Sequence, residues 1–90
     1  MNPSSKDPYL DQRKRLTFRA WHRGTREMDF ILGSFADQNI NNMSVEELKY
    51  FDDLLQINDP ILYNWYLGKE GIPANMMNPV LEKYLAHKVA

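Results

Sequence analysis

The stretch Trp21-His22-Arg23-Gly24-Thr25-Arg26-Glu27-Met28-Asp29 joins a basic amphipathic segment to an apolar one and places a glycine at the joint. This arrangement is typical of a corner between two helices, because glycine can adopt positive φ or let its backbone approach another surface closely. Glu27 falls at the expected third residue of the second helix, near its free N–H groups and positive dipole end. Arg23 and Glu27 flank the turn, so we expect both to project from one corner. The pattern alone does not establish a function, since it also arises by chance in helical hairpins.

Upstream of the corner, a helix is predicted from Tyr9 to about His22. Asp7-Pro8 supplies its start, because aspartate caps free N–H groups and proline fits the first helical position. Two adjacent rows of this helix are largely apolar. The first row contains Leu10, either Thr17 or Phe18, and Trp21, and the second contains Leu16 and Ala20. The other positions include a basic run of Arg13, Lys14, Arg15 and Arg19. We interpret this run as a solvated face, with docking to a partner as the alternative.

Downstream of the corner, apolar residues recur with the spacing of one helix face, at Met28, Ile31, Leu32, Phe35 and Ala36. This helix should end near Asn39. Gly33 lies inside it and lowers helix stability by roughly 1 kcal/mol relative to alanine. We therefore expect Gly33 to pack closely against another helix.

A third helix has the clearest start in the chain, at Met43-Ser44-Val45-Glu46-Glu47-Leu48. Ser44 and Glu47 form a capping box, and Met43 and Leu48 are placed to form a hydrophobic staple. The periodicity turns one set of residues inward, namely Leu48, Phe51, Leu54 and Leu55, and another set outward, namely Lys49, Asp52 and Asp53.

Two more helices follow. Asn58-Asp59-Pro60 separates the third helix from the fourth, again with aspartate as the cap and proline at the first position. The fourth helix presents a stripe of Ile61, Leu62, Trp65 and Tyr66 and ends at Gly68. The last helix starts near Met76 or Asn78 and buries Val80, Leu81, Tyr84 and Leu85. Positive charge near its C-terminus, from Lys83, His87 and Lys88, suits the helix dipole.

Five helices and no sustained alternation of apolar and polar residues predict an all-α fold, a compact five-helix bundle in a single domain. Residues 1–8 are interpreted as a flexible lead-in and residues 9–90 as the helical domain. Because the connections are short, successive helices are expected to pack as neighbours.

Composition excludes several classes of function. The 90 residues include no cysteine, so disulfides, thiolate metal sites and cysteine catalysis are excluded. The net charge of −1 argues against general binding of nucleic acids or membranes, although residues 1–27 carry seven of the eleven basic residues. No apolar run approaches the roughly 18 residues that span a bilayer. With no apolar core of a secretory signal at the start, a bacterial cytoplasmic protein is the simplest interpretation.

Catalytic and metal-binding patterns are not recognised. His22 and His87 are far apart in sequence, and neither has a helical zinc partner, so no metal site is expected. We interpret His22 as a surface residue. The adjacent Asp52 and Asp53 point about 100° apart on a helix, so they do not share a proton or a metal easily. Residue patterns therefore indicate a small helical binding module that is not an enzyme, with its binding site at the corner.

Three features occur in order along the chain: Arg23-Gly24-Thr25-Arg26-Glu27 followed by Asp29, an acidic helix after Met43-Ser44, and the segment Asp59-Pro60-Ile61-Leu62-Tyr63-Asn64-Trp65. With these features, the chain from about Arg15 to Leu85 resembles the small flavinylation factors of succinate dehydrogenase.

The resemblance implies a five-helix bundle that binds the flavoprotein subunit of succinate dehydrogenase, with fumarate reductase as a further client in bacteria. It implies that the protein promotes the covalent bond between that subunit's histidine and the 8α-methyl carbon of FAD. Arg23, Gly24 and Glu27 would contact the partner, with Arg26 and Asp29 as secondary contacts. FAD would be held by the partner, and stable FAD binding by this chain alone is not expected.

An alternative class remains open, a regulatory protein-binding module such as an antitoxin, because members of this family have also been described in that way. The oligomeric state is also open, since an apolar residue left outside the core, such as Phe30, can support a dimer.

Overall fold

A computed structural model of the chain describes residues 7–89. Six of the eight positions of the predicted flexible lead-in therefore lie outside the described residues. The described residues form five α-helices and no strand: α1 (Leu10–Trp21), α2 (Arg26–Asn39), α3 (Val45–Leu55), α4 (Asp59–Leu67) and α5 (Pro79–Ala86). Two 3-10 turns, η2 (Ile40–Asn42) and η3 (Ala74–Met76), lie in the connections. The predicted all-α, five-helix fold is confirmed, and no helix in this range is both long and apolar enough to span a membrane.

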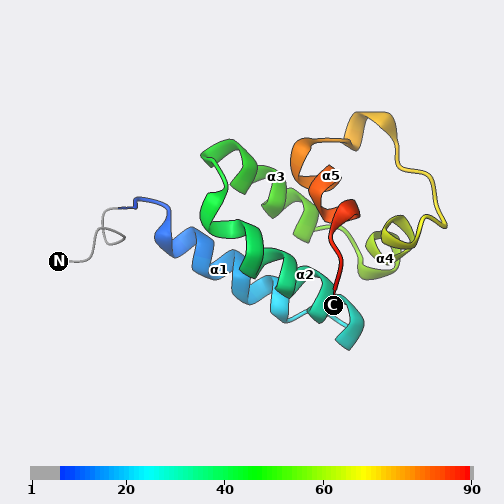
Figure 1. The fold of residues 1–90 in the computed structure, drawn as a ribbon, viewed down its shortest axis with the longest axis horizontal. Coiled ribbons are helices and arrows are strands. Elements are labelled where there is room, and N and C mark those ends of the chain that lie inside the picture. The colour runs from blue at the N-terminus through cyan, green and yellow to red at the C-terminus, as the bar shows by residue number, and fades with distance from the viewer. Residues whose placement is uncertain (1–6, 90) are drawn as a thin grey trace.

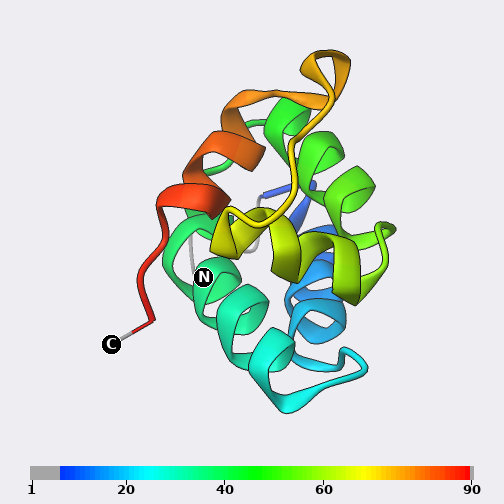
Figure 2. The same ribbon diagram turned by 90° about the vertical axis from the view of Figure 1, so that its right-hand side faces the viewer.

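Two pairs of helices, α1 with α2 and α4 with α5, are joined through α3 (Figures 1 and 2). α1 and α2 run antiparallel along each other, and α4 contacts α5. α3 packs mainly on α1 and α5 rather than on its sequence neighbours. The expectation that successive helices pack as neighbours is therefore wrong for α3, because η2 turns the chain back across α1.

The core draws on all five helices. Its largest fully buried side chains are Tyr84, Phe35, Phe51, Met28, Leu32, Leu48, Leu62 and Val80. The Phe35 ring lies 5.6 Å from the Phe51 ring and 6.1 Å from the Tyr84 ring, centroid to centroid. The buried Tyr84 hydroxyl donates a hydrogen bond of 2.9 Å to the Leu62 carbonyl, which satisfies a polar group that burial would otherwise penalise.

The helix ends follow the local sequence signals in three places. Ser44 and Glu47 form the predicted capping box, with hydrogen bonds of 3.1 and 3.0 Å. Gly68 ends α4 with φ of 73°, and the side chain of Asn78 caps α5. The start of α1 differs from the prediction: the helix begins at Leu10, and the Asp7 carboxylate accepts the N–H of Tyr9 in the preceding turn.

Arg13 is not part of a solvated face, contrary to the interpretation of the basic run. Its side chain is only 12% exposed and pairs with Asp7 at 2.8 Å. The guanidinium also donates to the carbonyls of Ile40 and Met43, at either end of η2. A single arginine thus holds the turn that directs α3 back over α1, which periodicity alone does not reveal.

Gly33 packs closely against another helix, as predicted. A Cβ at this position would overlap the benzo ring of Trp21 on α1. That indole is held on α2 by a 3.2 Å hydrogen bond to Asp37 and an edge-on contact with Phe30. The close packing of α1 on α2 therefore depends on the missing side chain.

Replacing Gly33 with alanine should lower the free energy of unfolding by about 1–2 kcal/mol, because overpacking against a fixed ring outweighs the helix propensity gained. Urea denaturation of wild type and Gly33→Ala tests this. A Gly71→Ala control, at a position where an added Cβ meets nothing, should be close to neutral. Equal stability of Gly33→Ala and wild type would contradict the packing argument.

His87 lies at the C-terminal end of α5, as predicted, but its side chain is buried. Instead of adding positive charge to the end of α5, its ring is buried, hydrogen-bonded to Ser34 Oγ at 2.8 Å and packed edge-on against Phe35. Its carbonyl accepts a 2.6 Å hydrogen bond from the Tyr66 hydroxyl. Burial lowers the pKa of His87 below its ordinary value of 6.5, so the fold favours the neutral ring.

Stability should therefore fall as the pH drops below about 6.5, because the unfolded chain then binds a proton that folded His87 resists. The carboxylates of Asp7 and Glu47, whose pKa values hydrogen bonds hold below their ordinary range, contribute to acid loss only at lower pH. Urea unfolding at about pH 7.5 and about pH 5.5 should show a larger loss for wild type than for His87→Gln. Parallel losses in the two proteins would contradict this assignment.

Candidate functional site

The corner between α1 and α2 is a tight four-residue connection from His22 to Thr25. Thr25 is the cap of α2, and its hydroxyl accepts the N–H of Met28 at 3.2 Å. Glu27 is consequently the second residue of α2, one position earlier than predicted, although it remains in the first turn. Gly24 does not adopt positive φ, so its role here depends on its small size rather than on conformational freedom.

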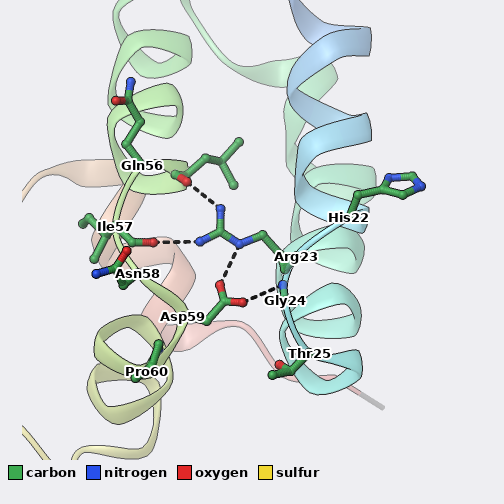
Figure 3. Close-up of a pocket in the computed structure, with 10 residues that line it drawn as sticks. His22, Arg23, Gly24, Thr25, Gln56, Ile57, Asn58, Asp59 and Pro60 are labelled. Atoms are coloured by element: carbon green, nitrogen blue, oxygen red, sulfur yellow. Dashed lines mark hydrogen bonds and ion pairs between the residues drawn. The ribbon is translucent and has the colours of Figure 1, made fainter.

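Arg23 links this corner to the neighbouring end of α3 and start of α4 (Figure 3). Its Nε lies 2.7 Å from Asp59 Oδ1, and its Nη2 lies 2.7 Å from the Ile57 carbonyl oxygen. Nη1 donates to the carbonyl of Leu55, the last residue of α3. The guanidinium thus satisfies carbonyl groups at the C-terminus of α3, which the helix itself leaves without partners.

Asp59 is the partner of the corner and not the cap predicted for α4. Asn58 holds the cap position without a side-chain hydrogen bond, and Asp59 is the first helical residue. One carboxylate oxygen binds Arg23, and the other accepts the N–H of Gly24 at 2.8 Å. In this position the carboxylate binds a full cation as well as a backbone N–H, whereas a cap would offer it only backbone N–H groups.

Gly24 allows this approach of Asp59. An added Cβ at Gly24 would lie 3.1 Å from Asp59 Oδ2, tight enough that the carboxylate would have to shift by a few tenths of an ångström. On the other side of the turn, the Asp29 carboxylate accepts the backbone N–H of Arg23. The corner is therefore fixed from both sides, by a residue of α2 and by a residue of α4.

The five residues predicted to contact a partner separate into two groups. Arg23, with a side chain 12% exposed, and Asp29 are engaged within the chain, so the expectation that Arg23 projects freely differs from the structure. Gly24, Arg26 and Glu27 lie exposed on the outside of the corner. Within residues 7–89, neither Arg26 nor Glu27 forms an ion pair. The partner contacts of all five residues remain predictions.

Three depressions lie around the corner, and the exposed Glu27 lines two of them. One of about 630 Å³ lies between the corner and the segment 55–60, and the Arg23 and Asp59 pair lines it. A second, mostly apolar, is about 310 Å³ and lies between Glu27 and Tyr63 of α4. A third, of about 510 Å³, also has Glu27 and Tyr63 in its lining and extends to the half-exposed Phe30 and Leu67. Glu27 thus stands between recesses that α2 and α4 form together.

Helix periodicity does not reveal that α4 lines the recesses beside Glu27. Asp59 was predicted only as a helix cap, and Tyr63 was singled out only as part of the segment from Asp59 to Trp65 in the family resemblance. The structure brings this segment against the corner more than 30 residues away, through the Arg23–Asp59 pair. The motifs that are separate in sequence form one surface in the fold.

Comparisons with known proteins identify the family of this chain. The family described as "Flavinator of succinate dehydrogenase" matches residues 14–88, which include the corner and the segment from Asp59 to Trp65. "FAD assembly factor SdhE" of Acetobacter pasteurianus is 37% identical over 79 residues, covering 88% of this chain and 72% of that protein. The protein of the same name from Legionella pneumophila is 39% identical over 59 residues, covering 66% of this chain and 73% of its own length.

A mitochondrial relative is similar as well. "Succinate dehydrogenase assembly factor 2, mitochondrial" of Dictyostelium discoideum is 37% identical over 75 residues, which cover 83% of this chain. The chain spans about half the length of that relative, 53%. No solved structure matched the chain.

Proposed function

The chain belongs to the succinate dehydrogenase flavinator family, and from this we propose that it binds the flavoprotein subunit of succinate dehydrogenase and promotes covalent attachment of FAD to it. The main structural support for this proposal is that Arg23 of the corner binds Asp59 of the segment from Asp59 to Trp65, and both residues lie inside the range that matches the family. The bacterial relatives support this assembly role over the antitoxin alternative.

We propose that Arg23 and Asp29 position the corner while Gly24, Arg26 and Glu27 face the flavoprotein. The corner is fixed by hydrogen bonds to α2 and α4 before any partner arrives. A preformed surface loses less conformational entropy on binding than a flexible one. The exposed Glu27 and Arg26 then offer one acceptor and one donor group for charge-assisted hydrogen bonds with the partner.

The covalent chemistry belongs to the partner in this proposal. The flavoprotein supplies the histidine and holds the FAD, and this chain acts as an assembly factor rather than as an enzyme. Holding reacting groups in a productive orientation can by itself lower a barrier by several kcal/mol. The sequence has no glycine-rich phosphate loop, and accordingly we propose that the chain alone does not hold FAD stably. We also propose a bacterial cytoplasmic location and fumarate reductase as a second client.

Reconstitution with purified components tests the function. Incubation of the flavoprotein subunit with FAD should give covalent flavin, seen as fluorescence of the denatured subunit, faster with this protein than without it. The flavoprotein of fumarate reductase, assayed in parallel, tests the second client. An unchanged rate with succinate dehydrogenase flavoprotein, at concentrations where the two proteins bind, would contradict the proposal.

A further inference from the structure

The outward face of α1 carries exposed cations around an exposed aromatic ring. Lys14, Arg15 and Arg19 are all exposed, and Phe18 between them is 63% exposed, the most exposed large hydrophobic side chain in the described range. The Phe18 ring stacks on His22 with 3.9 Å between ring centroids and 18° between ring planes. Figure 1 shows α1 at the edge of the bundle, alongside α2.

The hydrophobic core does not use this face. α1 turns Leu16 and Ala20 into the core, and its internal cation is Arg13. Arg19 pairs with Asp52 at 2.8 Å but keeps 43% of its side chain exposed, and Lys14 and Arg15 form no ion pair within residues 7–89. Figure 3 shows the His22 ring directed away from the Arg23 network. The ring stacks on Phe18 instead.

We propose that this face of α1, defined by Lys14, Arg15, Phe18 and His22, docks onto an acidic surface of the flavoprotein that has an apolar recess for Phe18. The inference rests on the proposed function and adds a second contact to the corner. The face leads into the corner through His22 and Arg23, so one partner can cover both. It also concentrates the positive charge of the chain, since residues 28–90 carry nine acidic and only four basic residues.

The chemistry fits an acidic protein better than a nucleic acid. Binding to a phosphate backbone commonly uses about six to ten cationic contacts, far more than the two unpaired cations of this face. Asp11 adds an exposed carboxylate at its start, and the chain as a whole has a net charge of −1. A few cations around an aromatic anchor are instead typical of protein interfaces, where charge raises the association rate and the anchor slows dissociation.

Stopped-flow binding to the purified flavoprotein subunit of succinate dehydrogenase tests the inference. Lys14→Glu with Arg15→Glu should slow association about tenfold at about 20 mM salt and much less at about 300 mM, because salt screens the attraction. Phe18→Ala should speed dissociation about tenfold with little change in the association rate. Urea unfolding of each variant checks that these exposed substitutions leave the fold intact.

The matched control is Lys49→Glu with Lys69→Glu, which makes the same change in net charge at exposed residues outside this face. It should associate at nearly the wild-type rate. Association and dissociation of both face variants at wild-type rates would overturn the inference while leaving the proposed function intact. No binding of the wild type at any salt concentration would overturn both. Wild-type binding to duplex DNA at about 150 mM salt, lost in the Lys14 and Arg15 variant, would replace the acidic protein with a nucleic acid.

Discussion

Replacement of Arg23 by alanine is expected to lower the free energy of unfolding by about 3–5 kcal/mol. The substitution leaves the Asp59 carboxylate, 14% exposed, without its cation, and it removes the donors that satisfy the carbonyls of Leu55 and Ile57. A charge left unpaired in a largely desolvated position is more destabilising than the loss of the pair itself. Urea denaturation monitored by circular dichroism measures the change.

Arg13→Ala is the matched control for Arg23→Ala. Both side chains are 12% exposed, and each binds one aspartate and two backbone carbonyls. Both variants should be destabilised, but only Arg23→Ala should reduce support of flavinylation when the two are compared at a temperature where each remains folded. If Arg23→Ala lowered the free energy of unfolding by less than about 1 kcal/mol, the Arg23–Asp59 pair would be no stronger than a surface ion pair.

Glu27→Ala is expected to abolish support of flavinylation while leaving the bundle folded. Glu27 is exposed and forms no ion pair within the described residues, so its removal should lower stability by only about 0.5 kcal/mol through the helix dipole. If its carboxylate is desolvated against the flavoprotein, the loss in binding free energy should be about 2 kcal/mol or more, roughly 30-fold in Kd. Calorimetric titration into the purified flavoprotein measures it.

Glu46→Ala makes the same change at an equivalent position, since Glu46 is the exposed second residue of α3 as Glu27 is of α2. It should match Glu27→Ala in stability and wild type in binding. Gly24→Arg should also abolish the activity, but it is the less specific test because any Cβ at Gly24 presses on Asp59. Equal binding by Glu27→Ala and Glu46→Ala would contradict the assignment of Glu27.

Features encoded within a single helix were predictable from sequence. The capping box of Ser44 and Glu47, the inward stripe of α3 and the left-handed Gly68 each depend on residues close together in the chain. The need for close packing at Gly33 was also predictable, because glycine within a helix requires a compensating contact, although its partner Trp21 was not identified.

The long-range polar contacts were not predictable in the same way. Arg13, Asp59 and His87 each carry a local signal, for a solvated face, a helix cap and a charged helix end, and in each case a distant partner prevails. Such a pairing depends on which elements meet in space, and no sequence spacing encodes that. The corner was identified as a site from Arg23 to Asp29, but its link to α4 required the fold.

In-gel flavin fluorescence of the denatured succinate dehydrogenase flavoprotein tests the central claim, that the corner presents Glu27 to this partner. The measurement compares cells lacking the gene with cells complemented by wild type, Glu27→Ala or Glu46→Ala. We expect the covalent flavin signal to be lost in the deletion and restored by wild type and Glu46→Ala but not by Glu27→Ala, at equal protein levels. An unchanged signal in the deletion would contradict the assembly function, and full restoration by Glu27→Ala would contradict the role of the corner.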